Sequence, residues 1–479
     1  MKKIFTLLAL AFSLNALAQY PTLNVTLLSV WDSIQIPAEP VYAIRYNGIW
    51  GWVDPQDNKE YAIIGSSEGT HFIDISNPTA PVQRDFVAGR RNQCIWREYK
   101  TYQNYCYMVS DDGSPNSMQI IDMSYLPDSV SVVHDNNNII SRAHTLFIDG
   151  TNLYFGIPKG PAVGGQSKMA IFSLANPILP TFIRNIESDD PGADYVHDMF
   201  VRNDTIYASE SYSGMHIYRW TGTAFAPLAT ITTYLDQGYN HSSALTGDGN
   251  TLIFCDEVPV NMQVKSLDVS NLGNLTVVDY FKSTPTTTAT PHNPFIRAGD
   301  NSRAIIAYYS DGVQFFDISN PANVFRTGFI DTDPNDCPSC PNASYQGCWG
   351  AYVDLPSGLI IASDMQRGLF VIDANGALTN NAQCDCGAPP VLTVGPNPSA
   401  NDFTLTVSGN NSENAFYEIY DVTGRIIETG NFTTTQGTSC CGTYSTGSKV
   451  INATNYSSGV YFVTVKGNDF SVTQKLIKQ

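Results

Sequence analysis

The fold is decided by a phrase that reads FIDISNP at residues 72–78 and returns, in varied form, six more times. The further copies are IIDMS (120–124), IFSLANP (171–177), IYRW (217–220), SLDVSN (266–271), FFDISNP (315–321) and FVIDANG (370–376). Aligned on the Asp position, the copies fall at 74, 122, 173, 219, 268, 317 and 373, with 46 to 56 residues between neighbours. A period of this size predicts a repeat protein, here with seven units.

Each unit has the same internal order. Residues 143–188, for example, hold four short β-type runs that are separated by Gly, Asn, Asp and Pro turn signals, with no helical periodicity between them. Four strands per unit of about 51 residues are typical of β-propeller blades, whereas the alternative, a parallel β-solenoid, usually has shorter coils. We therefore expect an all-β chain with a seven-bladed β-propeller over residues 19–376. The early strand at 23–30 is a candidate to close the ring.

The composition excludes several classes of protein. The 479 residues include 44 acidic and 26 basic side chains, a net charge of -18, and no basic stripe, so nucleic-acid binding is not expected. Apolar residues make up 43% of the chain, which is enough for a large core and excludes wholesale disorder.

Residues 1–18 have the three parts of a secretory signal peptide. A lysine pair, Lys2-Lys3, precedes an apolar run over residues 4–14, and residues 16–18 read Ala-Leu-Ala, a small-x-small cleavage site. The apolar run is too short to span a bilayer and no later stretch is long enough, so we expect no transmembrane segment. These features predict a protein that is exported via the periplasm to the cell surface or the extracellular space.

Most of residues 20–376 resembles a known family. The IIDMS, FIDIS and FFDIS phrases are similar to the LVIVD repeat, and GIWGWVDPQDNKEYAIIGSSEGTHFIDISNP (48–78) resembles the opening of the choice-of-anchor B family of bacterial surface proteins. The runs PHNPFIRAGD (291–300) and CWGAYVDLPSGLIIASDMQRGLFVID (348–373) strengthen the likeness. The resemblance implies a secreted propeller that is carried on varying C-terminal anchors. It implies no particular biochemical activity.

The composition changes near the end of the repeats. Residues 377–392 are small, polar and rich in Gly, Ala, Asn and Pro, which predicts a linker, and the alternating runs of 393–479 predict a small Ig-like β-sandwich. The motifs GPNPSAN (395–401), EIYDVTGR (418–425), YSSGVYFVTV (456–465) and QKLIKQ (474–479) resemble the type A C-terminal sorting domain of type IX secretion cargo. The resemblance implies that the type IX secretion machinery is a partner, and that the domain is cleaved or used for surface attachment. The alternative is an ordinary Ig-like adhesion module.

Ten cysteines in an exported chain predict disulfides. The even number permits full pairing, although the spacing does not define the connectivity. An alternative is a zinc site with three thiolates from Cys337, Cys340 and Cys348, but the sequence shows no fourth ligand. The ten are Cys94, Cys106, Cys255, Cys337, Cys340, Cys348, Cys384, Cys386, Cys440 and Cys441.

The strongest candidate site is one slot near the start of the first strand of each unit. Units three to six carry a histidine in this slot, at His144, His197, His241 and His292, whereas units one, two and seven carry Ile49, Trp96 and Trp349. In a propeller the slot lies near the central channel, on the face that bears the loops between the second and third strands. We expect the carboxylates of those loops on the same face: Glu68, Asp111, Asp112, Glu210, Asp256, Glu257, Asp311 and Asp364.

Imidazoles beside carboxylates suit a divalent transition metal such as Zn, Cu, Fe or Mn, which can activate a water for hydrolysis or elimination. In the alternative, the histidines only tie neighbouring blades together. A structural residue should recur around the whole ring, however, and three units lack the histidine. The acidic loops at 54–60, 187–194 and 331–336 are either Ca²⁺ sites or solvated turns.

No P-loop, dinucleotide fingerprint or Cys–His nucleophile arrangement is visible. We therefore expect an exported binding or adhesion module for a glycan or a protein. The alternative is a metal-dependent hydrolase or lyase that acts on an extracellular polymer through the histidine face.

Overall fold

The computed structural model describes residues 20–114, 116–284, 287–334, 345–379, 391–410, 416–431, 434–439, 442–466 and 471–479. The predicted signal peptide and most of the predicted linker lie outside the described residues. The chain divides into two compact units. The first comprises Met1–Ser283 and Thr287–Asn381, and the second comprises Ala382–Gln479 with Thr284–Thr286.

The first unit contains seven antiparallel sheets of four or five strands. The first sheet contains β3 (Tyr46–Val53), β4 (Glu60–Ser66), β5 (Gly69–Asp74) and β6 (Val82–Ala88), and the second contains β7 (Glu98–Tyr102), β8 (Tyr105–Val109), β9 (Met118–Asp122) and β10 (Ser131–Asn136). The third sheet contains β11 (Thr145–Asp149), β12 (Asn152–Gly156), β15 (Met169–Ser173) and β16 (Thr181–Asn185). The fourth contains β17 (Asp198–Arg202), β18 (Thr205–Ser209), β19 (Met215–Trp220) and β20 (Phe225–Ile231). The fifth sheet contains β21 (Asn240–Leu245), β22 (Thr251–Asp256), β23 (Val264–Asp268) and β24 (Thr276–Phe281). The sixth contains β25 (Asn293–Phe295), β26 (Arg303–Ala307), β27 (Val313–Asp317), β28 (Phe325–Ile330) and β1 (Thr22–Leu23). The seventh contains β29 (Cys348–Tyr352), β30 (Ile360–Asp364), β31 (Gly368–Asp373) and β2 (Thr26–Trp31).

Short elements complete this unit. A two-stranded ribbon of β13 (Lys159–Gly160) and β14 (Gly165–Gln166) sits within the third repeat. Among the described residues, 3₁₀ turns cover Pro161–Val163 and Ile186–Ser188, and a short helix, α1 (Asn375–Thr379), follows β31. None of the described helices is long and apolar enough to cross a membrane.

The recurring Asp of the repeat phrase ends the third strand of a sheet. The side chains of Asp74, Asp122, Asp268, Asp317 and Asp373 each accept a hydrogen bond from the main-chain N–H two residues further on. Bonds of this kind start a turn, and an Asn-Pro that follows cannot continue the strand ladder. The phrase therefore recurs because each sheet needs the same turn at this point.

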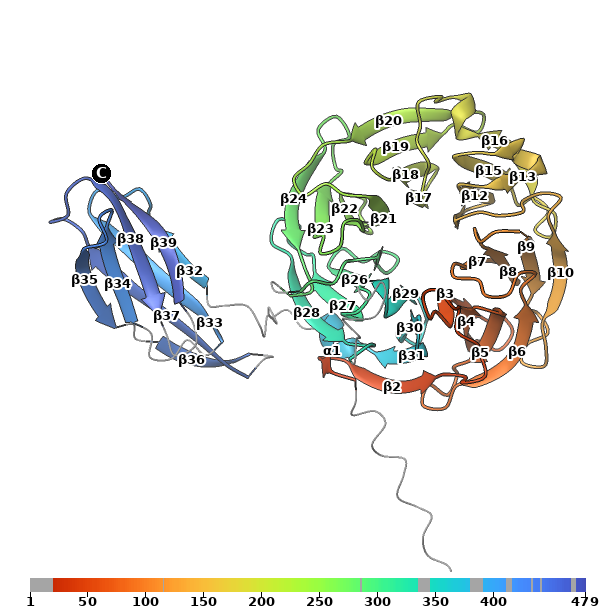
Figure 1. Ribbon diagram of the computed structural model, residues 1–479, viewed down its shortest axis with the longest axis horizontal. Helices are drawn as coiled ribbons and strands as arrows, with labels where there is room; N and C mark the ends of the chain where they lie inside the picture. Colours follow the sequence, from red (N-terminus) through yellow and green to blue (C-terminus); the bar gives the residue numbers. More distant parts are fainter. Residues whose placement is uncertain are drawn as a thin grey trace, which may run out of the picture. The chain divides into compact units, whose positions relative to one another are not determined.

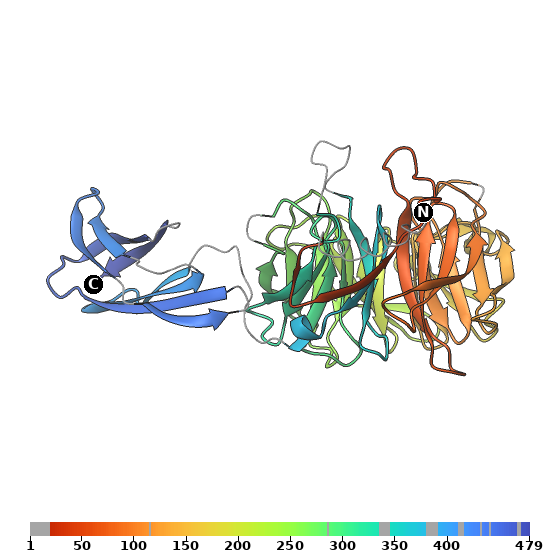
Figure 2. The same cartoon turned by 90° about the horizontal axis from the view of Figure 1, so that it is seen from below.

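The seven sheets surround a central opening, with the first strand of each sheet innermost (Figure 1). The inner strands contact one another in the order β3, β7, β11, β17, β21, β25 and β29, and β29 contacts β3. β2 pairs with β31 and β1 with β28, so the first residues of the unit complete its last two sheets. Figure 2 shows the strands running between the two faces of this unit. The prediction of an all-β chain is confirmed.

The hydrophobic core of the first unit lies between neighbouring sheets. One cluster, for example, joins Tyr107 and Ile120 of the second sheet to Leu153 and Phe172 of the third. Among the described residues, every adjacent pair of sheets shares such a cluster, including the last and the first sheet. Burial of apolar area at about 25 cal/mol per Å² therefore holds each sheet to both of its neighbours.

The second unit has two antiparallel sheets that share one core. The core takes Leu405 and Ile451 from one sheet and Ile419 and Val463 from the other. The sheets are β32 (Val391–Gly395), β33 (Asp402–Asn410), β37 (Gly442–Asn452), β36 (Thr434–Ser439), and β35 (Ile426–Asn431), β34 (Phe416–Asp421), β38 (Gly459–Lys466), β39 (Ser471–Lys478).

The four described cysteines are buried free thiols, so the predicted disulfide pairing is wrong for Cys94, Cys106, Cys255 and Cys348. Three of them belong to the clusters between sheets, where a thiol packs as a small apolar group. Burial also raises the pKa of the Cys106 thiol, which keeps it protonated and inert. The other six cysteines, and with them most of the alternative zinc site, lie outside the described residues.

Candidate functional site

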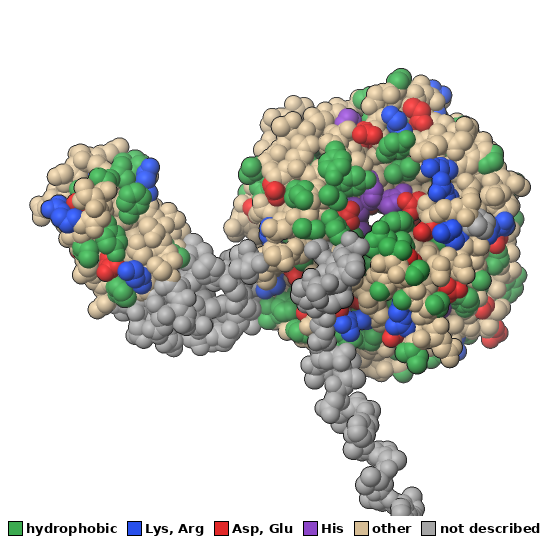
Figure 3. All heavy atoms as spheres, in the orientation of Figure 1, with side chains coloured by type: hydrophobic (Ala, Val, Ile, Leu, Met, Phe, Trp, Pro, Cys, Tyr) green, Lys and Arg blue, Asp and Glu red, His purple; other side chains and the backbone are tan. Residues whose placement is uncertain are grey.

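A cavity of about 380 Å³ occupies the centre of the first unit, and residues of the inner strands and of the loops leading into them form its wall. Figure 3 shows histidine side chains, coloured purple, beside acidic side chains at the opening in the middle of this unit. The seven residues that the sequence assigns to one slot all line the cavity: Ile49, Trp96, His144, His197, His241, His292 and Trp349.

The backbone register places the histidines in equivalent positions. The main-chain N–H groups of His144, His197 and His292 donate to the carbonyl at the end of β12, β18 and β26, at 2.8 to 3.0 Å. His241 lies inside β21, where a bulge between Asn240 and Ser242 shifts the register by one residue. The repeat thus delivers four imidazoles to neighbouring points on the wall.

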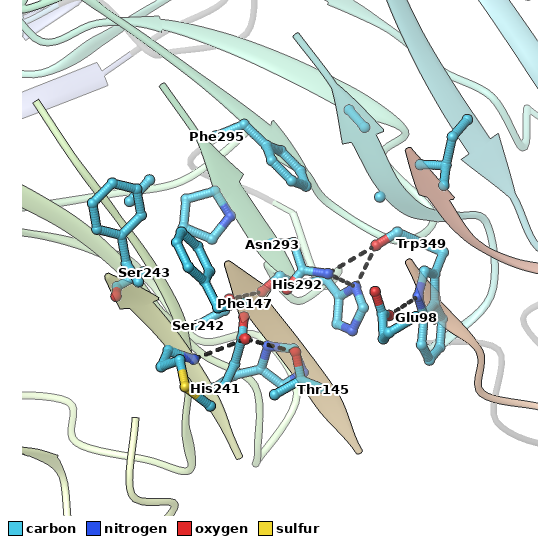
Figure 4. A pocket seen from close by; sticks show the side chains of 18 of the residues that line it. Glu98, Thr145, Phe147, His241, Ser242, Ser243, His292, Asn293, Phe295 and Trp349 are labelled. Carbon is cyan, nitrogen blue, oxygen red and sulfur yellow. Dashed lines mark hydrogen bonds between the residues drawn. The ribbon is translucent and has the colours of Figure 1, made fainter. Parts of the chain in front are cut away.

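The four imidazoles form a continuous arc. The ring centroids lie 4.0 Å apart between His144 and His197, 4.3 Å between His197 and His241, and 4.4 Å between His241 and His292. Trp349 continues the arc at 4.7 Å from His292, and Figure 4 shows this end of it. All of the rings are largely buried, with the side chain of His144 18% exposed and the other three residues 2 to 8% exposed.

Hydrogen bonds hold three of the four rings through Nδ1. In His144 this atom lies 2.6 Å from Oδ2 of Asp111. In His197 and His292 it lies 3.2 Å and 2.5 Å from the main-chain carbonyl of the next residue in the slot. The Nε2 atoms of these three rings have no hydrogen bond to another described residue, and all three residues line the cavity.

His241 differs from its neighbours. Its Nδ1 atom is buried without a hydrogen-bond partner among the described residues, and its Nε2 atom lies 3.7 Å from Oε2 of Glu257. The other carboxylate oxygen, Oε1, accepts a hydrogen bond of 2.6 Å from the hydroxyl of Tyr309. His241, Glu257 and His292 each offer a ligand atom, and these three atoms all lie within 4.8 Å of one another.

The electrostatics set His144 apart from the other three rings of the arc. Burial lowers the pKa of His197 and of His241 well below 6.5, and it lowers the pKa of His292 to about 3. Burial opposes protonation of His144 as well, but the adjacent Asp111 outweighs it and raises the pKa of that ring. At neutral pH three imidazoles therefore keep a lone pair, which is the form that binds metals.

Of the eight predicted carboxylates, only Asp111 and Glu257 line the cavity. The other six do not line it, and Asp112, Glu210 and Asp256 instead hold the loops. Each of these three is buried and accepts a main-chain N–H from the loop that leads into the inner strand of its sheet. Such bonds satisfy buried backbone donors, which explains acidic residues at this position without a ligand. The six are Glu68, Asp112, Glu210, Asp256, Asp311 and Asp364.

The sequence analysis missed a second set of cavity residues, namely Glu98, Lys100 and Asp198. Burial raises the pKa of both carboxyl groups and lowers the pKa of the ammonium group. The sequence pattern that could have revealed these residues is the period of two along the inner strands, because alternate side chains of a strand point to the channel. The same alternation brings an apolar wall of Phe147, Phe200, Phe295 and Tyr352 to the cavity.

Each of the acidic loops that the sequence offers as Ca²⁺ sites has a carboxylate that pairs with a basic side chain. Asp57 binds Lys59 at 2.5 Å, Asp189 binds Arg184 at 2.6 Å, and Asp333 binds Arg367 at 2.7 Å. Residues 335 and 336 lie outside the described residues. Salt-bridged turns explain the described parts of these loops.

Comparison with known proteins identifies the C-terminal region. Residues 393–479 match the family described as the secretion system C-terminal sorting domain. A search of curated proteins found no match to the chain. The resemblance of residues 20–376 to choice-of-anchor B proteins and to the LVIVD repeat stays a prediction. The sorting domain implies the type IX secretion machinery as a partner, so the chain is a type IX secretion cargo protein that is exported to the cell surface or the extracellular space.

Proposed function

We propose that the first unit is a seven-bladed β-propeller that binds a glycan or a protein ligand outside the cell, at the histidine end of its central channel. Its seven sheets, the contact of β29 with β3 and the apolar cluster between the last and the first sheet support a closed ring. The proposed domains are a signal peptide at 1–18, the propeller at 19–376, a linker at 377–392 and an Ig-like sorting domain at 393–479.

The observation that carries the binding role is the arc of four largely buried imidazoles on the cavity wall, in which Nδ1 of His241 is buried without a hydrogen-bond partner among the described residues. Burial of a polar atom without a partner costs about 1–3 kcal/mol, so a purely structural residue at this slot would be apolar, as Ile49 is. Units one, two and seven close the ring without a histidine. The fold therefore does not require the arc, and a ligand is the better explanation for it.

The volume of the cavity and the side chains of its wall limit the kind of ligand that can bind there. A cavity of about 380 Å³ holds a sugar unit or a side chain rather than a long polymer segment. Its aromatic wall offers flat faces for stacking, and the imidazoles and carboxylates offer donors and acceptors for hydroxyl groups. We therefore expect the end of a glycan chain or an inserted side chain of a partner protein to occupy the channel.

The test compares the mature chain with a His197→Ala/His241→Ala double variant on arrays of extracellular glycans and proteins. The matched control is His134→Ala, a buried histidine of the outer strand β10 that does not line the cavity. We expect a ligand of the parent and of the control to be lost in the double variant at unchanged thermal stability. Equal binding by the double variant would show that the channel is not the binding site.

A metal-dependent hydrolase or lyase is the second candidate, and the convergence of His241, Glu257 and His292 favours it. In that case the metal supplies a water activated near neutral pH, and the channel wall orients the substrate. Turnover of an extracellular polymer that a chelator abolishes would establish this role, whereas ligand binding that survives the chelator favours the binding module.

A further inference from the structure

We propose that His241, His292 and Glu257 form a binding site for one divalent transition metal ion. The inference rests on the ligand-binding role proposed for the channel and assigns three of its residues to the ion. It also separates these three from His144 and His197, which the sequence alone could not distinguish from them.

The spacing of the three groups is close to that of a metal site. A tetrahedral ion with bonds of about 2.0–2.1 Å holds its ligand atoms about 3.3 Å apart. His241 Nε2 and Glu257 Oε2 lie 3.7 Å apart, and all three ligand atoms lie within 4.8 Å of one another. Small side-chain rotations into the cavity bring them to bonding distance without a change in the backbone.

Surrounding hydrogen bonds prepare two of the ligands. The Nδ1–H of His292 donates to the carbonyl of Trp349 at 2.5 Å, which leaves the lone pair on Nε2. The Tyr309 hydroxyl holds the outer oxygen of Glu257 at 2.6 Å and leaves Oε2 for the ion. Metal-ligating histidines and carboxylates are commonly held by a second hydrogen bond of this kind.

The third ligand, His241, is the least restrained of the three. His241 is only 5% exposed, yet its Nδ1 has no hydrogen-bond partner among the described residues. Burial without compensation destabilises such a ring. The other ring nitrogen, Nε2, lies 3.7 Å from Oε2 of Glu257 and is the atom that we assign to the ion.

The charge of the cavity wall also favours a cation. The wall carries five carboxyl groups against one ammonium group, and one of the five, Asp111, pairs with the His144 ring. Carboxylates in a confined space are costly unless a cation compensates them. The five carboxyl groups belong to Glu98, Asp111, Asp198, Glu257 and Asp354, and the ammonium group belongs to Lys100.

The ligand set indicates the class of metal. Two imidazoles and one carboxylate suit Zn²⁺, Co²⁺ or another divalent transition metal, whereas Ca²⁺ and Mg²⁺ prefer oxygen ligands. His144 is engaged with Asp111, and His197 lies between that pair and the site. Three protein ligands leave at least one coordination position for water or for a ligand in the channel.

The experiment uses the mature full-length chain after chelator treatment and dialysis. Zn²⁺ binding is measured by titration calorimetry, and Co²⁺ binding by its visible absorption, which reports ligand geometry. We expect one ion per chain, a loss of affinity of more than about a hundredfold in His241→Phe and in Glu257→Gln, and a loss of about tenfold in Tyr309→Phe. His134→Ala should bind as the parent does, and each variant is checked for an unchanged unfolding transition.

Two results would overturn the inference: no Zn²⁺ or Co²⁺ binding by the parent, or parent-like binding by both His241→Phe and Glu257→Gln. Should one variant fail to fold, the other decides. Ligand capture on the arrays by the chelated protein tests the channel separately. If the protein captures a ligand but binds no metal, the metal site is contradicted and the ligand-binding role stands. If the protein binds metal but captures no ligand, the metal site stands and the ligand-binding role is contradicted.

Discussion

The two sides of the channel wall have the same backbone but different chemistry. The histidine wall, formed by His144, His197, His241 and His292, leaves ring nitrogens without protein partners. On the tryptophan wall, formed by Trp50, Trp96 and Trp349, indole groups contact the buried charged side chains instead. Trp349 Nε1 donates to Glu98 at 3.0 Å, and the ammonium of Lys100 lies 3.8 Å above the ring of Trp50.

The two walls therefore differ in whether their buried polar groups have partners within the protein. The tryptophan wall satisfies its own polar groups and resembles a packed core with a few buried charges. The histidine wall keeps Nδ1 of His241 buried without a partner among the described residues, at a cost in stability. Substitutions on the two walls should therefore fail in different ways.

The largest effect is expected from Arg97→Ala in β7's approach loop, beside Trp96. Arg97 is fully buried and donates to the carbonyls of Ser66 at 2.9 Å and Arg91 at 2.7 Å. Its removal leaves buried carbonyls unpaired and a cavity, so we expect a loss of about 3 kcal/mol or more in the free energy of unfolding. Urea denaturation measures this loss.

The contrasting substitution on the histidine wall is His241→Phe, which keeps an aromatic ring and removes a buried nitrogen that has no partner among the described residues. We expect the free energy of unfolding of the metal-free protein to change by no more than about 1 kcal/mol, or to rise. If His241→Phe destabilises the protein as much as Arg97→Ala does, the histidine wall is structural and the contrast between the walls is lost.

The sequence predicted the repeat and the slot because both depend on local chemistry. The turn after Asp74 or Asp317 needs only the next two residues, and the slot keeps a fixed offset from the first turn of its sheet. Neither depends on how the ring closes. Period and turn residues are therefore enough to find both.

The sequence could not divide the roles of adjacent acidic residues. Asp111 turns to His144, whereas Asp112 accepts the N–H groups of the loop before β7. Glu257 faces the cavity, whereas Asp256 lies 3.1 Å from the ammonium of Lys265 inside its own sheet. Which of two neighbours faces the channel depends on tertiary register, which the residue types do not encode.

A pH series compares His144 of the histidine wall with His71, a buried histidine that does not line the cavity. Burial lowers the pKa of His71 in β5 to about 4, so its contribution to stability is full above pH 6.5 and is lost as the pH falls from 6.5 to 4. That loss amounts to at most about 3 kcal/mol. His71→Gln should flatten the acid side of the stability curve measured by urea denaturation. A curve of unchanged slope would contradict burial as the cause.

His144 should behave in the opposite way. Its pKa is raised because Asp111 outweighs burial, so the stability that the pair contributes is present below pH 6.5 and is lost as the pH rises through the raised pKa. Asp111→Asn should therefore destabilise the protein more at pH 6 than at pH 9. An equal loss at both values would mean that the pair contributes by packing alone.

The smallest effect is expected from Lys100→Met, which removes the one ammonium group of the cavity wall and keeps the length of the side chain. Its charge opposes a divalent cation in the same cavity, so its removal should tighten Zn²⁺ binding by about threefold, in line with a partly screened interaction between like charges. The matched control is Lys282→Met, because Lys282 lies outside the cavity and binds the exposed Asn261 at 2.6 Å. Tighter Zn²⁺ binding in Lys100→Met and not in Lys282→Met would show that the tryptophan wall tunes the charge felt at the histidine wall. Equal affinities in the two variants would confine the metal site to the histidine wall alone.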